Sequence, residues 1–176
     1  MNSGHLTIVL DFGDNGEMPI GQETASLKAA SPRRIGLVGC VKAKSHHPRP
    51  AKDLYISTLF RGRRSFVEYS CDEWWILSAE HGLVHPDQVL APYDTALKGA
   101  GRAKCRTWSS LVLSSIDSEI RPGPSEVFEM HTGAEYRDFG VVDGLLSRGC
   151  FVENPTSEMR FGPQLKFYKE FVERVR

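Results

Sequence analysis

Short apolar runs alternate with longer amphipathic stretches along the chain from Arg34 onward. The short runs predict buried strands, because they are rich in β-branched and aromatic residues and end at small or polar ones. They cover residues 35–40, 74–79, 126–131 and 150–155. The longer stretches predict helices over residues 51–69, 102–120, 134–147 and 162–175. Strands that alternate with helices predict an α/β fold, a three-layer sandwich with a mostly parallel central sheet.

Two further segments lie outside this alternation. Pro86 and Pro92 predict a loop after the second strand, because proline interrupts both helices and ladders. Near the N-terminus, residues 6–10 predict one strand, and a polar segment without a clear period follows them. We therefore expect an N-terminal appendage at residues 1–32, with an extra strand and a linker, before a single α/β domain at residues 33–176.

The composition fits one globular domain, since 40% of the 176 residues are hydrophobic and 25% are charged. No apolar run approaches the roughly 20 residues that a membrane helix needs, and no secretion signal is visible at the N-terminus. The four cysteines form no C-x-x-C pair, which favours free thiols in a reducing compartment. We expect a cytoplasmic protein that makes no contact with membranes.

The charge is balanced over the whole chain but not along it. Residues 31–70 hold nine basic residues and two acidic ones, which gives a local charge of +7. Such an excess is typical of a surface that binds phosphate or nucleic acid, and equally of a solvated surface without a ligand. This segment includes the Arg61-Gly62-Arg63-Arg64 cluster.

Titratable side chains gather where the predicted strands end. In open parallel sheets, ligands bind outside the carboxyl ends of the strands, so these residues are expected to share one rim. They are Cys40, Lys42, Lys44, Glu80, His81, His131, Glu135, Tyr136 and Arg137.

Each catalytic candidate has a plainer alternative. Lys44 is a nucleophile if burial or Lys42 lowers its pKa, and otherwise a phosphate-binding or solvated lysine. Cys40 is either a reactive thiolate or a small buried hydrophobe. Glu80 and His81 form a carboxylate–imidazole pair on a tight turn that can divide the tasks of base and orienter, unless His81 simply caps the turn.

The binding candidates are aromatic, basic or placed at a helix start. Tyr55, Tyr93 and Tyr136 are suited to stack on a base. The segment from His131 to Arg137 lies at a strand-to-helix junction, where free amides and a guanidinium can hold an anion. No clustered ligand set and no G-x-G-x-x-G fingerprint is present, so neither a metal nor a cofactor is expected.

Several short motifs, in this order, resemble those of the DUF6884 family of small bacterial and phage proteins. They are Gly39-Cys40-Val-Lys42-Ala-Lys44, the run Ala51–Phe60 with Ser57, the run Ser78–Val84, Pro92-Tyr93-Asp94 and Gly162-Pro-Gln164-Leu165-Lys166. The resemblance covers roughly residues 34–170 and adds Ser57 and Asp94 to the substrate-binding candidates. It implies a uracil-DNA-glycosylase-like α/β fold.

The spacing from Cys40 to Lys44 is also similar to the Pro-Cys-Ser-x-x-Lys motif in the lyase domain of archaeosine synthases. There the lysine attacks the nitrile of a deazaguanine base. In this chain Gly39 stands where that motif has proline, and Val41 stands where it has serine.

Our first hypothesis is a hydrolase or transferase that acts on the N-glycosidic bond of a nucleoside, a nucleotide or a nucleic-acid base, including modified bases. Glu80 would stabilise the oxocarbenium-like sugar, and His81 would assist departure of the base. One alternative is a non-catalytic nucleic-acid-binding module that uses the basic segment. A second alternative is a lysine-dependent base-modifying lyase. The protein is expected to be a monomer or a homodimer.

Overall fold

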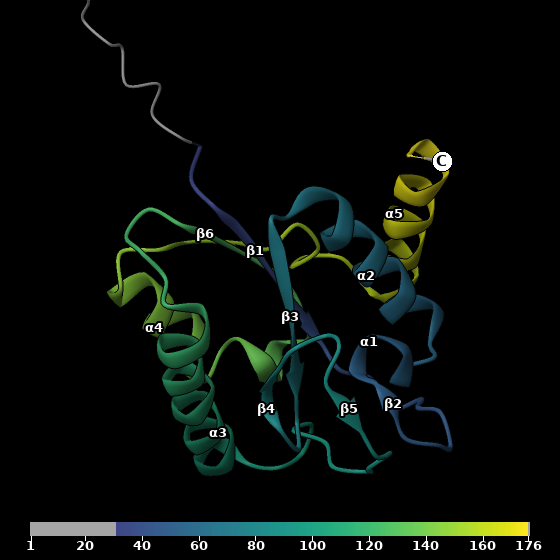
Figure 1. The fold of residues 1–176 in the computed structure, drawn as a ribbon, viewed down its shortest axis with the longest axis horizontal. Coiled ribbons are helices and arrows are strands. Elements are labelled where there is room, and N and C mark those ends of the chain that lie inside the picture. Colours follow the sequence, from purple (N-terminus) through teal and green to yellow (C-terminus); the bar gives the residue numbers. More distant parts are fainter. Residues whose placement is uncertain (1–30, 176) are drawn as a thin grey trace, which may run out of the picture. The chain divides into compact units, whose positions relative to one another are not determined.

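The strand β1, Arg34–Gly39, forms the centre of a five-stranded sheet in the order β4-β3-β1-β6-β7 (Figure 1). The computed structural model describes residues 31–175, so the strand expected at residues 6–10 lies outside the described residues. The other strands of the sheet are β3 (Glu73–Ser78), β4 (Gly82–Val84), β6 (Val127–His131) and β7 (Phe151–Glu153). All neighbouring pairs are parallel except β3 and β4. The predicted α/β fold with a mostly parallel central sheet is confirmed.

Alternate residues of β1 point into two separate cores. Ile35 and Leu37 are fully buried in the core that contains the helix α3 (Arg102–Ser115) and the helix α4 (Val141–Ser147). Val38 is fully buried on the other face, against α1 (Ala51–Leu54) and α2 (Thr58–Ser70). The closing helix α5, Phe161–Arg174, packs on α2 (Figure 1). Helices therefore cover both faces of the sheet.

The predicted helix over residues 51–69 is wrong as a single element. It is divided into α1 and α2, because Tyr55 leaves the helix and pairs with Lys44 in an isolated antiparallel bridge. Ser57 then starts α2 as its N-cap, and its Oγ accepts a hydrogen bond of 3.1 Å from the amide of Phe60.

The other predicted helices differ mainly at their ends. The helix α3 continues into a π-helical turn, η1 (Ile116–Ile120), within the predicted range of residues 102–120. The predicted helix over residues 134–147 consists of a 3₁₀ turn, η2 (Ala134–Tyr136), and α4. Gly140 separates them with a positive φ of 129°, a conformation that favours glycine.

Three short strands were not predicted. The strand β4 follows the turn after β3 and pairs back on it in an antiparallel direction. Within the expected loop, β5 (Val89–Leu90) pairs with β2 (Arg49–Pro50) in a small two-stranded sheet. Pro50 fits this position because it lies at the end of a two-residue strand rather than inside a long ladder.

The strand order creates a topological switch point between β1 and β6. The chain leaves β1 toward β3 on one side and reaches β6 on the other side, so the connections that follow β1 and β6 separate there. Ligands of doubly wound sheets bind at the carboxyl ends of the strands at such a point. We therefore expect a ligand site next to Cys40, directly after β1, and residues 132–137, directly after β6.

Candidate functional site

A cavity of about 470 Å³ lies at the carboxyl ends of β1 and β6. This volume lies within the range of small-molecule sites. We call it the rim cavity. Its wall includes six of the predicted site residues, and the loop at residues 94–98 closes one side. These six residues are Cys40, Lys42, Lys44, Asp94, Glu135 and Tyr136.

The cavity wall joins the end of β1 to the segment after β6 through Cys40. The Cys40 sulfur lies 3.1 Å from the hydroxyl of Tyr136 and accepts a hydrogen bond of 3.4 Å from the amide of Ala79. The ring of Tyr136 packs edge-on against Trp108 of α3, with ring centroids 5.3 Å apart. The aromatic contact fixes the tyrosine, so the thiol and the phenol share one stretch of the wall.

The ammonium group of Lys44 lies over the ring of a tyrosine. Its Nζ lies 4.2 Å from the ring centroid of Tyr93 and 5.7 Å from that of Tyr55, which is within the range of cation–π attraction. Burial lowers the pKa of Lys44, and the nearby side chains of Cys40 and Asp94 oppose this effect. Lys44 is therefore a cation that gives up its proton more readily than an exposed lysine.

A chain of hydroxyl groups supports Tyr93 from behind. The Tyr93 hydroxyl lies 2.7 Å from that of Tyr55 and 2.8 Å from Oγ of Ser78. Burial raises the pKa of Tyr55 to about 12, so this phenol stays protonated at neutral pH. Burial also raises the pKa of Tyr93. Both tyrosines therefore remain neutral hydrogen-bonding groups.

Glu80 and His81 lie beside the rim cavity, and their side chains do not form its wall. Both are exposed, and Ser78 holds their amides through its Oγ at 3.2 and 2.9 Å. The His81 ring packs edge-on against Tyr93 at 5.1 Å, and Thr95 of the cavity wall donates a hydrogen bond to the Glu80 carboxylate. The carboxylates that line the cavity are instead those of Asp94 and Glu135.

Five other predicted residues do not line the rim cavity: Tyr55, Tyr93, His131, Ser57 and Arg137. His131 is fully buried between Glu129 and Tyr168, with both ring nitrogens hydrogen-bonded. Ser57 caps α2. Arg137 lies after η2 with its Nε buried and without a hydrogen-bond partner among the described residues.

The sequence prediction missed two cationic residues of the cavity wall, the exposed Lys98 and the buried Arg63. Arg63 lines the rim cavity from α2, although it is only 5% exposed. In the sequence it is part of a basic cluster on a helix, away from any strand end, and no local pattern separates it from its neighbours.

Within residues 31–175, no group of three or more His, Cys, Asp or Glu residues is arranged to hold a metal ion. In the same part of the chain, no helix is long and apolar enough to cross a membrane. All four cysteines are free thiols.

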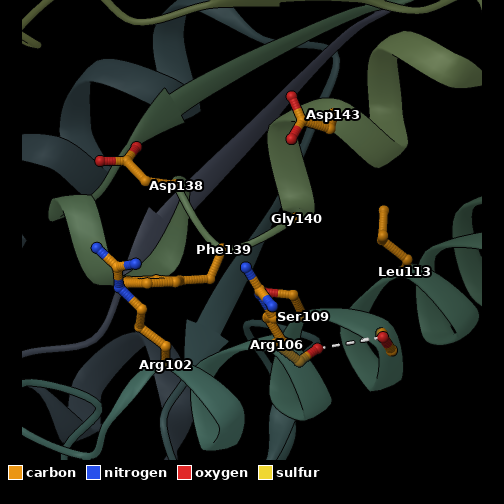
Figure 2. Close-up of a pocket in the computed structure, with 9 residues that line it drawn as sticks. Arg102, Arg106, Ser109, Leu113, Asp138, Phe139, Gly140 and Asp143 are labelled. Atoms are coloured by element: carbon orange, nitrogen blue, oxygen red, sulfur yellow. Dashed lines mark hydrogen bonds between the residues drawn. The ribbon is translucent and has the colours of Figure 1, made fainter.

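A second hollow, of about 660 Å³, lies between α3 and the segment at residues 138–143. Figure 2 shows Arg102 and Arg106 reaching from α3 toward Phe139 and Gly140. This hollow lies away from the switch point and contains none of the predicted site residues.

The fold and the rim cavity define a doubly wound α/β protein with a site at the switch point of its sheet. Residues 35–170 match the family model described as "Family of unknown function (DUF6884)", and the chain belongs to this family. Over 85 residues, it is 28% identical to "Uncharacterized protein YfjM" of Bacillus subtilis (strain 168). The match covers 45% of this chain and 57% of YfjM, so the chain spans just over half the length of this relative. No solved structure matches the chain.

Proposed function

We propose that the rim cavity binds a nucleoside or nucleotide and that the protein is a hydrolase or transferase acting on its N-glycosidic bond. The observation that carries the proposal is the combination of two carboxylates and an ammonium group on the wall of one cavity at the switch point: Asp94, Glu135 and Lys44. The uracil-DNA-glycosylase-like form of the fold belongs to this proposal. The four parallel strands in the order β3-β1-β6-β7 are compatible with it.

The chemistry of N-glycosidic cleavage suits these groups. Its transition state carries positive charge on the sugar, which a nearby carboxylate stabilises. We assign this role to Asp94, because it lies close enough to Lys44 to affect the pKa of that lysine. We assign to Glu135, which lines the same cavity, the contact with the sugar hydroxyls. Glu80, which accepts a hydrogen bond from Thr95, is a positioning residue in this scheme.

The proposed hydrolysis uses one water molecule, Lys44 as the acid and Asp94 as the base. The C1′–N bond breaks, and its electron pair goes to the base nitrogen, which takes a proton from the Lys44 ammonium. A water oxygen bonds to C1′ and transfers a proton to Asp94, which returns it to Lys44 through solvent. The lowered pKa of Lys44 makes this ammonium a better acid than an exposed lysine. In a transferase, a second base takes the place of water.

The ring of Tyr136 gives the base a place to lie. Tyr136 lines the rim cavity and packs against Trp108, so its ring is held in position before a ligand binds. Stacking of a base on an aromatic ring contributes about 1–3 kcal/mol. In the scheme we keep for His81, which packs edge-on against Tyr93, the role of assisting departure of the base.

The test is release of free base, measured by chromatography after incubation of the full chain with nucleosides, their monophosphates and DNA oligonucleotides. We expect Asp94→Asn to reduce the release rate about 100-fold or more. The matched control is Glu119→Gln, an exposed carboxylate on η1. No release from any of these substrates would overturn the function. Release that is unchanged in Asp94→Asn and Glu135→Gln would overturn the roles.

The same preparations separate the alternatives. A lysine-dependent lyase predicts an adduct on Lys44 that borohydride traps and mass spectrometry detects. A non-catalytic nucleic-acid-binding module predicts binding that weakens steeply with salt. The basic segment offers this module less free charge than its sequence suggests, because carboxylates pair with Arg33, Arg34, Lys52 and Arg64.

A further inference from the structure

Arg63 carries a buried guanidinium group that lines the rim cavity. It lies in the second turn of α2, is 5% exposed, and still contributes to the wall of the rim cavity. A charge removed from water in this way is stabilised only if a partner compensates for the lost hydration. The partners of Arg63 therefore indicate what the site is built to hold.

The described residues supply no such compensating charge. No carboxylate of residues 31–175 lies within 4.0 Å of the Arg63 guanidinium, and its buried Nε has no hydrogen-bond partner there. By contrast, the more exposed Arg34 contacts both Glu129 and Glu153, and Arg64, next to Arg63, contacts Asp53 and Glu68. The most buried arginine of the described residues is thus left without an acid.

A neutral amide holds Arg63 in place. Arg63 Nη2 donates a hydrogen bond of 3.0 Å to Oε1 of Gln164 on α5. Gln164 Nε2 donates in turn to the carbonyl of Met159 at 2.8 Å, which fixes the amide with its oxygen toward the guanidinium. Gln164 belongs to the Gly162–Lys166 motif, for which the proposed reaction has no use. The amide orients the guanidinium without neutralising it.

Other cationic groups lie near Arg63. Burial lowers the pKa of Arg63, the hydroxyl of Tyr168 opposes this effect, and the nearby positive charge of Arg137 adds to it. Lys42 and Lys44 line the same cavity. At the start of the segment after β6, the hydroxyl of Thr132 is buried and has no hydrogen-bond partner within the described chain. An anion bound here would gain several charge-assisted contacts at once.

We propose that Arg63, oriented by Gln164, binds the phosphate monoester of a nucleotide, so that the ligand of the rim cavity is a free nucleoside monophosphate. This proposal rests on the proposed function and narrows its substrate. A phosphate presents several oxygens to the planar fork of a guanidinium, and its double charge suits a cavity wall that carries Arg63, Lys42 and Lys44. A phosphate at the end of a nucleotide can bind to a buried arginine. A phosphate within a nucleic-acid strand is linked to nucleotides on both sides, and these need space on both sides of the site.

The direct test is calorimetric binding of inorganic phosphate and of nucleoside monophosphates to the full chain, at constant ionic strength. We expect Arg63→Met to weaken binding of both by about tenfold or more, since a charged hydrogen-bonding partner is lost. The matched control is Arg61→Gln, an exposed arginine on the same helix, which is expected to bind as the wild type does. Arg63→Met also removes an uncompensated buried charge, so the melting temperature without phosphate should stay the same or rise.

A second variant keeps the proposal testable if Arg63→Met does not fold. Gln164→Glu places a carboxylate at the guanidinium, and this internal anion should compete with phosphate and weaken its binding about tenfold or more. Phosphate affinity equal to wild type in folded Arg63→Met or Gln164→Glu would overturn the site. Equal affinity for a nucleoside and its monophosphate, or binding of an oligonucleotide but no monophosphate, would also overturn it.

The two proposals fail separately. If monophosphates bind in an Arg63-dependent manner but no base is released, the reaction is wrong and the phosphate site stands. If base is released equally fast from nucleosides and monophosphates, and Arg63→Met leaves both rates unchanged, the phosphate site is wrong and the reaction stands.

Discussion

The hydroxyl of Tyr136 lies 3.1 Å from the sulfur of Cys40 and joins the segment after β6 to the end of β1. Burial raises the pKa of Tyr136, so the phenol keeps its proton and remains a neutral hydrogen-bonding partner of the sulfur. Two chain segments separated by almost a hundred residues in sequence thereby present one polar wall to the rim cavity.

This position predicts the order in which the cysteines react. Cys40 lines the cavity, whereas Cys105 and Cys150 are buried in the core. Cys71 is partly buried, and burial raises its pKa to about 11, so only about a thousandth of it is thiolate at pH 8. Iodoacetamide at pH 8 should therefore modify Cys40 first, and modification of Cys71 should speed up as the pH rises toward 11.

Peptide mapping by mass spectrometry measures these rates in the native protein. The Cys40→Ser variant is the control, because it should lose the fast phase and keep the slow one. Modification of Cys71 before Cys40 at pH 8 would contradict the predicted order.

The hydrogen bonds of Ser78 stabilise the turn after β3, so we expect the loss of its hydroxyl to destabilise the protein. Its fully buried Oγ accepts hydrogen bonds from the amides of Glu80 and His81 and contacts the Tyr93 hydroxyl. Ser78→Ala leaves these groups without that partner, and we expect the free energy of unfolding to fall by about 1–3 kcal/mol. Urea denaturation measures the change. Ser114→Ala, at an exposed position of α3, should change stability by less than about 0.5 kcal/mol. Equal stability of the two variants would refute this role for Ser78.

The sequence predicts the layers of the fold better than its short elements. The run from Ile35 to Gly39 is apolar and β-branched, and it forms the buried strand that its pattern indicates. The strand β4 is three residues long and directly follows a turn, so it has no period from which to predict it. The break between α1 and α2 did have a signal, namely the N-cap serine at position 57, but the apolar positions on both sides suggested one continuous helix.

The candidate site divides in the same way. The strand-end rule groups Cys40, Lys44 and Tyr136, and the structure places them around one cavity. The rule does not find Arg63, because this residue lies within the helix α2 and not at the end of a strand. His131 lies at the end of a strand, as the rule requires. The alternation of side chains along β6, however, buries its ring on the same face of the sheet as Glu129 and not in the rim cavity. The facing direction of a strand's last residue depends on register, which composition does not give.

Gly62 predicts how closely α5 must approach α2. A Cβ atom at Gly62 would lie 2.7 Å from Cβ of Tyr168, far inside normal contact distance. Gly62→Ala should therefore push the helices apart and reduce the free energy of unfolding by about 1–3 kcal/mol. It should also weaken phosphate binding, because the Arg63–Gln164 hydrogen bond joins the same two helices.

Chemical denaturation, combined with phosphate calorimetry, checks both effects. Gly162→Ala is the matched control, since a Cβ atom there meets nothing within 4 Å. It should leave both properties close to those of the wild type. A Gly62→Ala protein as stable as the control would show that α2 and α5 can accommodate a Cβ atom at this position.

A buried polar chain runs from α5 into the sheet through His131. Burial lowers the pKa of His131, so the ring is neutral, and Nε2–H donates to the Glu129 carboxylate at 2.9 Å. Burial raises the pKa of Tyr168, whose hydroxyl donates to His131 Nδ1 at 2.6 Å. Burial alone would raise the pKa of Glu129, but the hydrogen bonds from His131 and Arg34 outweigh it and lower the pKa. The positive charge of Arg63 also opposes protonation of the histidine.

This chain predicts that acid destabilises the protein in two steps. The folded pKa of His131 lies below the ordinary value of 6.5, so below pH 6.5 the unfolded chain binds a proton that the folded protein refuses. Stability from this residue is complete above pH 6.5 and falls as the pH drops, by at most about 1.4 kcal/mol per pH unit. Glu129 adds a second loss of stability below the ordinary carboxyl pKa of 4.5.

Urea denaturation between about pH 7 and pH 5 measures the first step. His131→Gln should be less stable at pH 7 and have a flatter pH dependence, while the exposed-site control His47→Gln keeps the wild-type slope. A wild-type slope in His131→Gln would mean that another group controls the acid response.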